Sequence, residues 1–167
     1  MKKIDMAGFS LLELMVVVVV VGLLASVAYP AYTDAILKGR RAQARVTIAE
    51  LMQQQERFMT QRNCYLAFNT ADDASATADA SAECGITAVF SVPFKSFSGD
   101  RPSDAAYLLS SRACVDGSVA VSLRECVRIE ARPVRPDPDA GVLWMSSTGA
   151  RGCTGSASVS RPTLCWP

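Results

Sequence analysis

The sequence contains no histidine, and this excludes several kinds of site at once. Without histidine there is no Ser-His-Asp triad, no histidine-ligated metal centre and no side chain that titrates near neutral pH unaided. The chain also contains no glycine-rich phosphate loop, nucleophile elbow or paired-carboxylate site. We therefore expect a protein that is not an enzyme and that needs no cofactor or metal.

Charged side chains are nearly missing from a long N-terminal stretch. Across residues 9–32 the only side chain charged at neutral pH is Glu13. As a helix this stretch would be roughly 36 Å long, which is enough to cross a bilayer. The residues from Thr33 onward have the mixed composition of a soluble domain, and the chain of 167 residues is long enough for one modest core.

The chain has little net charge, +1 overall, so it does not look like a nucleic-acid-binding protein. Arg124, Arg128 and Arg132 are spaced to line one face of a strand and could contact phosphate. Glu125 and Glu130 lie among them, so we expect a solvent-exposed face of mixed charge.

Cysteine occurs six times, and none of the six lies in a CxxC or other short metal-type spacing. All of them follow the apolar stretch. An even number of dispersed cysteines behind an export-like segment indicates a disulfide framework formed in an oxidising compartment.

Three interpretations of the N-terminus compete. A secretory signal peptide would start at Lys2 and Lys3 and be cut near residues 26–28, but Glu13 disfavours insertion by about 2.5–3.5 kcal/mol. A simple membrane anchor tolerates Glu13 but gives it no role. A short polar leader of residues 1–8 fits an apolar segment that starts only after Gly8.

The block GFSLLELMVVVVVVGLLASVAYPAY, residues 8–32, closely resembles the N-terminus of type IV pilins. In that family a dedicated peptidase cuts after the glycine and methylates the new amino terminus. The resemblance implies cleavage between Gly8 and Phe9, N-methylation of Phe9, and pairing of Glu13 with the Phe9 ammonium of an adjacent subunit. It also implies that the helix between Gly22 and Pro30 unwinds in the assembled filament.

Later segments resemble PilE-like minor pilins of Gram-negative bacteria: residues 40–45, 56–58, 63–65 and 147–149, and the terminal Cys165-Trp166. The resemblance implies the α+β pilin fold, in which a long N-terminal helix packs on a small antiparallel sheet with disulfide-closed loops. Residues 1–8 would be the leader, 9–32 the transmembrane and assembly helix, 33–62 the amphipathic half of the same helix, and 63–167 the globular head.

The implied function is that of a structural subunit, a minor pilin that supports pilus biogenesis, twitching motility or adhesion. It would sit in the inner membrane with its head in the periplasm and then enter the extracellular pilus. The implied partners are other pilins, the prepilin peptidase and the inner-membrane assembly machinery. Two alternatives remain: a pseudopilin of type II secretion, and a DNA-binding pilin for natural transformation, against which the slightly acidic head argues.

Charge near the membrane gives a conflicting signal about topology. Four basic residues follow the apolar stretch, between Lys38 and Arg45, and only Lys2 and Lys3 precede it. The positive-inside rule would then place the head in the cytoplasm. Since six cysteines would lie in a reducing compartment in that case, we keep the exported orientation.

The helix should continue well past the membrane, since residues 31–61 contain no proline and one glycine. Pro30 should bend it. Apolar residues recur at helical spacing and predict a face packed on a sheet. These are Leu37, Ala44, Ile48, Leu51 and Phe58, with Met52 and Met59 alongside.

Beyond the helix, residues 66–83 are small and polar and predict a loop. Residues 107–112, 126–131 and 142–147 predict strands, the second of them half-buried and antiparallel by its alternation. Asp116-Gly117 predicts a tight turn. The acidic pairs Asp72-Asp73 and Asp137-Pro138-Asp139 could bind calcium, but without the rest of a coordination pattern we expect solvated loops.

Strand parity favours one disulfide among the many that six cysteines allow. Cys114 and Cys126 fall at the facing ends of the first two strands, both pointing outward, and a bond between them would close the neck of a hairpin. A Cys153–Cys165 bond would close a C-terminal loop, which leaves Cys64 and Cys84 as the remaining pair.

Overall fold

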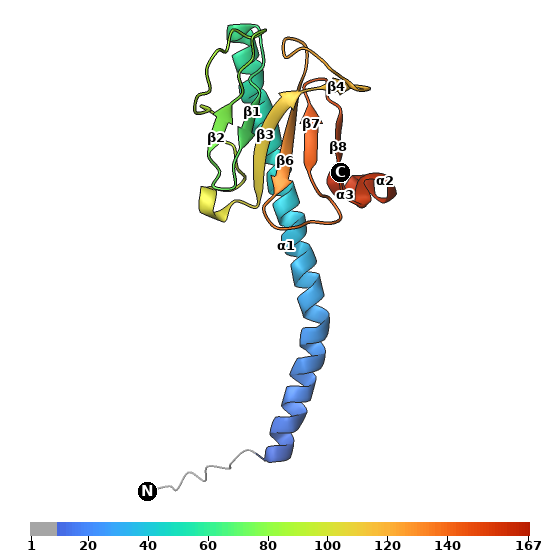
Figure 1. Ribbon diagram of the computed structural model, residues 1–167. Helices are drawn as coiled ribbons and strands as arrows, with labels where there is room; N and C mark the ends of the chain where they lie inside the picture. Colours follow the sequence, from blue (N-terminus) through green and yellow to red (C-terminus); the bar gives the residue numbers. More distant parts are fainter. Residues whose placement is uncertain (1–9) are drawn as a thin grey trace, which may run out of the picture. The chain divides into compact units, whose positions relative to one another are not determined.

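The computed structural model describes residues 10–167, which divide into two compact units between Lys38 and Gly39. Helix α1, Leu11–Arg62, begins in the first unit and continues into the second. The second unit contains the rest of α1 and all the other elements (Figure 1). The α+β class expected from the sequence is confirmed.

Six antiparallel strands form the main sheet, in the spatial order β2-β1-β3-β6-β7-β8. Their bounds are β1 Phe68–Thr70, β2 Ala76–Ala78, β3 Tyr107–Ala113, β6 Val127–Pro133, β7 Leu143–Ser146 and β8 Arg151–Cys153. The three predicted strands are confirmed as β3, β6 and β7, with ends that differ by one or two residues. Short helices complete the fold: η1 Pro102–Asp104, α2 Ala157–Ser160 and α3 Pro162–Cys165.

The core lies between the C-terminal part of α1 and one face of the sheet. Successive strand residues point to opposite faces, and Leu109 of β3 and Ile129 of β6 point inward with no exposed surface. Ile48 and Leu51 of α1 belong to the same buried cluster, as the apolar stripe predicts. Phe58 and Met59 are only partly buried, and Phe58 packs edge-on against Phe94.

Polar side chains also lie on the buried side of α1. Gln55 has no exposed surface, and its amide nitrogen donates to the Leu66 carbonyl at 2.7 Å while its amide oxygen accepts from the Leu66 N–H at 2.9 Å. The same nitrogen lies 3.2 Å from the Ser111 hydroxyl. Because these contacts satisfy the amide inside the protein, Gln55 can be buried without a large desolvation cost.

The predicted loop at residues 66–83 is wrong, because it contains β1 and β2. Phe68 pairs with Ser111 of β3 across the sheet and is fully buried. Small residues such as Ala76 and Ala78 form the neighbouring strand. These strands depend on partners far along the chain, which a local pattern cannot reveal.

A second, two-stranded sheet consists of β4 Val115–Asp116 and β5 Val119–Ala120. The predicted turn is confirmed: Gly117 has a φ of +62°, which glycine adopts without steric cost. Cys114 and Cys126 were expected to point outward: both line a groove together with the outward Arg128, although only 9% and 6% of their surface is exposed. Cys114 follows the last residue of β3 and Cys126 precedes the first of β6, so the disulfide joins the facing ends of these two strands.

Three disulfides are present in the structure, and the described residues include no free cysteine. They join Cys64 to Cys84, Cys114 to Cys126, and Cys153 to Cys165.

Candidate functional site

The apolar half of α1 is one candidate site. From Ser10 to Tyr32 every residue is exposed, and Leu11 and Val27 expose 78% and 73% of their surface. Residues 10–167 thus contain one helix long and apolar enough to cross a membrane. An exposed apolar surface of this length indicates contact with lipid or with other helices.

Glu13 lies in the first turn of α1, where a carboxylate is stabilised by the positive end of the helix dipole. It is exposed and is the only charged residue of the described apolar stretch. Gly8 and Phe9, the predicted sites of cleavage and methylation, lie outside the described residues. The pairing of Glu13 with a neighbouring Phe9 therefore stays a prediction.

The predicted weak points Gly22 and Pro30 both lie inside α1, and the helix continues through them. Proline removes one backbone N–H from the helix. Two hydroxyls near this point bond back to the helix: Ser26 donates to the Leu23 carbonyl at 2.7 Å and Thr33 to the Pro30 carbonyl at 2.8 Å. Unwinding concerns the assembled filament and stays a prediction.

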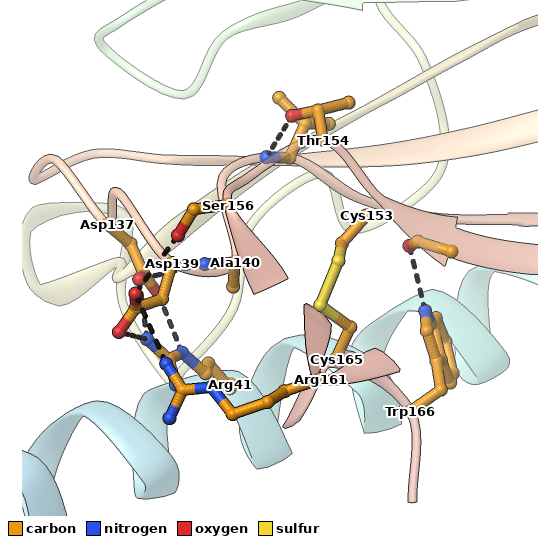
Figure 2. The surroundings of a disulfide bond; sticks show 12 residues. Arg41, Asp137, Asp139, Ala140, Cys153, Thr154, Ser156, Arg161, Cys165 and Trp166 are labelled. Atoms are coloured by element: carbon orange, nitrogen blue, oxygen red, sulfur yellow. Dashed lines mark hydrogen bonds and ion pairs between the residues drawn. A yellow bond between two sulfur atoms is a disulfide. The ribbon is translucent and has the colours of Figure 1, made fainter. Parts of the chain in front are cut away.

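A second candidate site is the C-terminal loop that the Cys153–Cys165 disulfide closes (Figure 2). The Trp166 indole N–H donates to the Gly152 carbonyl at 2.9 Å, which attaches the chain end to β8. On the other side Arg45 of α1 donates to the Cys165 carbonyl at 3.1 Å. The loop is therefore held against both the sheet and the helix.

A buried ion pair lies beside this loop. Arg41 of α1 donates to both carboxylate oxygens of Asp137, at 2.7 and 2.6 Å, and the two side chains are only 5% and 3% exposed. The Tyr107 hydroxyl donates to the same carboxylate at 3.1 Å, and the Ala140 N–H at 3.2 Å. The carboxylate therefore accepts bonds from a helix, a strand and its own loop.

This environment shifts the pKa of each member. Burial alone would raise the pKa of Asp137, but the bonds from Arg41 and the Ala140 N–H outweigh it, and the pKa is lowered. The hydrogen bond to Asp137 raises the pKa of Arg41. Burial first, and then the charge of Asp137, raise the pKa of the Tyr107 hydroxyl. The group thus stays an ion pair with a neutral tyrosine at neutral pH.

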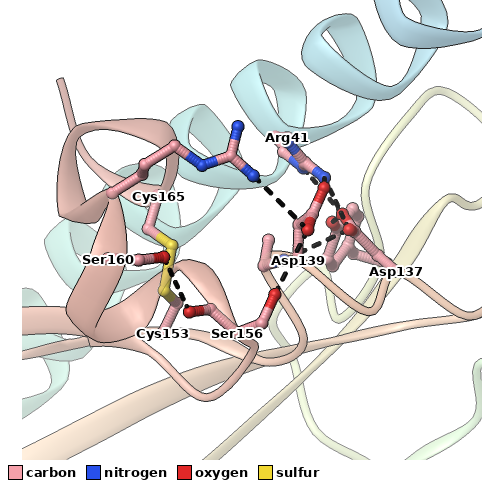
Figure 3. A network of polar contacts seen from close by, with 10 residues as sticks. Arg41, Asp137, Asp139, Cys153, Ser156, Ser160 and Cys165 are labelled. Carbon is pink, nitrogen blue, oxygen red and sulfur yellow. Dashed lines mark hydrogen bonds and ion pairs between the residues drawn. A yellow bond between two sulfur atoms is a disulfide. The ribbon is translucent and has the colours of Figure 1, made fainter.

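Asp139 extends the network to the disulfide loop, as Figure 3 shows. Its carboxylate accepts from the Ser156 hydroxyl at 3.2 Å and lies 3.6 Å from Arg161 and 3.8 Å from Arg41. Gly155 allows this docking, because a Cβ there would overlap the backbone of Asp139. The solvated-loop expectation is therefore wrong for Asp137, which is buried beneath the loop.

Arg124, Arg128 and Arg132 were expected to line one face of a strand, and this expectation is wrong for Arg124. Arg124 precedes β6 and donates to the Glu83 carbonyl, so it does not share the strand face. Arg128 and Arg132 do lie on β6. Arg112 of β3 stands directly opposite Arg128 and joins this face from the neighbouring strand.

Sequence reasoning overlooked Arg41, Gln55 and Arg112 as site residues, and it considered Asp137 only as a calcium ligand. A signal for two of them was present. The helical stripe has gaps at positions 41 and 55, where the spacing from Leu37 to Phe58 calls for buried residues. Arg41 and Gln55 fill these gaps.

Comparison with known families gives two matches. Residues 5–29 match the prokaryotic N-terminal methylation motif. Residues 30–113, half of the chain, match the family described as type IV minor pilin ComP, DNA uptake sequence receptor. No curated protein and no solved structure matches the chain significantly.

Proposed function

Because the chain belongs to the type IV minor pilin family ComP, we propose that it enters a pilus through its apolar helix and that its head binds DNA there. Its function as a pilin is structural, and the family implies prepilin processing and contacts with other pilus subunits. The exposed apolar stretch of α1, with Glu13 as its single charge, carries the proposal.

The steps of assembly follow from the chemistry of the N-terminus. Cleavage after Gly8 would remove the leader of residues 1–8 and give Phe9 a free ammonium, which is then methylated. In hydrocarbon the Glu13 carboxylate needs a partner or must be protonated. The Phe9 ammonium of an adjacent subunit supplies that partner and favours one axial offset between subunits.

The location of the subunit changes between processing and assembly. The apolar helix, residues 9–32, would anchor the subunit in the inner membrane with the head, residues 63–167, in the periplasm. The disulfides support this orientation, since they form and persist in oxidising compartments. After extraction from the membrane, the exposed apolar face would contact the helices of other pilins, and the helix between Gly22 and Pro30 would unwind.

A test of assembly compares Glu13→Ala with Glu50→Ala, an exposed glutamate of the same helix. Mass spectrometry should show normal cleavage and N-methylation of both variants. Immunoblots of sheared pili should lack the Glu13→Ala subunit and contain the Glu50→Ala subunit. Normal amounts of Glu13→Ala in the pilus would contradict the proposed pairing.

The DNA-binding role is supported by the description of the family. It predicts that deletion of the gene abolishes natural transformation while pili are still made and secretion continues. The full-length processed protein in detergent micelles should also bind duplex DNA. A deletion that impairs only secretion would indicate a pseudopilin instead.

A further inference from the structure

The outer face of the sheet, away from α1, carries an arginine cluster. On β6 the inward residues Ile129 and Ala131 alternate with the outward residues Arg128, Glu130 and Arg132. On β3 the outward Arg112 stands opposite Arg128. Three arginines thus share this part of the face with one glutamate, in a head that is slightly acidic as a whole.

Glu130 holds two of the arginines together. Its Oε1 atom accepts from Arg112 and also lies 3.0 Å from Nε of Arg128. Like charges directly opposite each other on neighbouring strands are destabilising, and a carboxylate shared by both offsets that repulsion. Glu130, together with Asp72, which pairs with Arg132, offsets two of the three arginine charges, so the cluster keeps a positive excess of one charge.

Arg128 is the fixed member of the cluster. Its guanidinium lies 4.1 Å from the centre of the Trp144 ring, and its side chain is 24% exposed. The ring in turn lies on Gly152, where a Cβ would come within 2.7 Å of it. Burial lowers the pKa of Arg128, although the charge of Glu130 partly opposes this. Arg128 therefore supports the face and is not its accessible cation.

Arg112 and Arg132 are the accessible members, with side chains 59% and 51% exposed. In the described chain each is bonded to a carboxylate through Nη2 only, Arg112 to Glu130 and Arg132 to Asp72. The other guanidinium donors are left for a ligand. Asp72 is 90% exposed, and a surface ion pair of this kind contributes about 0–1 kcal/mol, so a polyanion can displace it.

Both arginines line one groove of about 260 Å³. Asn69, Thr70 and Ser110 also line it, at the junction of β1, β3 and β6. Arginine forks bind phosphate oxygens in two-point geometry, and hydroxyl and amide groups are the usual companions in backbone contacts to DNA. Ser111, Glu130 and Val142 complete the lining of the groove.

We propose that Arg112 and Arg132 form a phosphate clamp, at which the outer face of the sheet contacts the sugar-phosphate backbone of DNA. The clamp rests on the DNA-binding role proposed above and gives that role a location. It would contribute affinity without reading base sequence, because phosphate contacts carry no sequence information directly.

The test measures fluorescence anisotropy of a labelled random-sequence duplex of about 30 base pairs, titrated with full-length processed protein in detergent at several salt concentrations. The variants are Arg112→Ala, Arg132→Ala and the double variant. Arg101→Ala is the matched control, because Arg101 is exposed and ion-paired but lies beside η1. Thermal unfolding checks that every variant is folded.

Each clamp variant should weaken binding several-fold and reduce the slope of log affinity against log salt by about 0.9, and the double variant by about 1.8. Arg101→Ala should match the wild type. If the wild type binds and the folded double variant keeps the wild-type slope, the clamp is wrong and the DNA-binding role stands. If the wild type does not bind even at low salt, the role itself fails and the clamp with it.

Discussion

The two halves of helix α1 differ in burial, and the difference is the opposite of what their hydrophobicity would predict. The N-terminal half, up to Tyr32, is almost entirely apolar, and all of its described residues are exposed. The C-terminal half is far more polar, yet it buries Arg41, Thr47 and Gln55 together with its apolar stripe. An apolar segment that packs against nothing in its own chain indicates contact with lipid or with other helices. A buried polar residue indicates a specific partner within the fold.

The largest effect on the head should come from Arg41→Ala. Removing one member of a buried ion pair leaves Asp137 buried without its charge partner, which typically costs about 3–5 kcal/mol of unfolding free energy. Arg40→Ala changes a neighbouring arginine that is only partly buried, and it should cost less than about 0.5 kcal/mol. Chemical denaturation followed by tryptophan fluorescence measures both, since Trp144 and Trp166 both lie in the second unit. Equal losses in the two variants would show that the ion pair has no special role.

A smaller effect should appear in the pH dependence of stability. The folded pKa of Asp137 is lowered, so its contribution is present above the ordinary aspartate pKa of about 3.9 and is lost as pH falls through the lower folded value. Asp73 and Glu83 also have lowered pKa values, because they accept bonds from Ser75 and from Leu123 and Ser122.

Asp137→Asn should therefore be less stable at neutral pH and should lose less stability than the wild type on acidification. The variant should still lose, on acidification, the stability that the carboxylates of Asp73 and Glu83 contribute. Denaturation series between neutral pH and about pH 3 measure the difference. Parallel curves for the two proteins would exclude a contribution from Asp137.

The smallest effect should come from the apolar half. Val18→Ala shortens a side chain that is 61% exposed and should change the stability of the head by less than about 0.5 kcal/mol. Ile48→Val removes only one methyl group from the buried half of the same helix, yet it should cost about 0.5–1.5 kcal/mol. Denaturation in detergent gives both values, and the order would be reversed if the apolar half stabilised the head.

The sequence predicted the parts of the fold that local patterns encode. The long helix, the three central strands and the turn at Gly117 follow from periodicity and turn chemistry. Parity also placed Cys114 and Cys126 at facing strand ends, and the structure joins these two residues. The short strands β1 and β2 could not be predicted, because they form only through the pairing of β1 with β3 and of β2 with β1.

The candidate sites were predictable to different degrees. The apolar helix and Glu13 could be recognised from composition and motif alone. The ion pair could not be predicted, because Arg41 and Asp137 are 96 positions apart in the sequence. The residues around each of them give no sign of its partner. The arginine face failed for a similar reason: Arg112 joins it from a second strand, and only the register of β3 against β6 brings it there.

The β4–β5 hairpin has a practical consequence for imaging. It lies outside the main sheet, the disulfide between Cys114 and Cys126 closes its base, and Val115 and Val119 are exposed at 55% and 69%. Exposed loop tips are the preferred sites for tolerated insertions. An epitope or peptide tag inserted between Gly117 and Ser118 would leave the register of the six main strands unchanged. Such a tag would allow a scarce subunit to be counted and located along single filaments by immunogold or fluorescence microscopy.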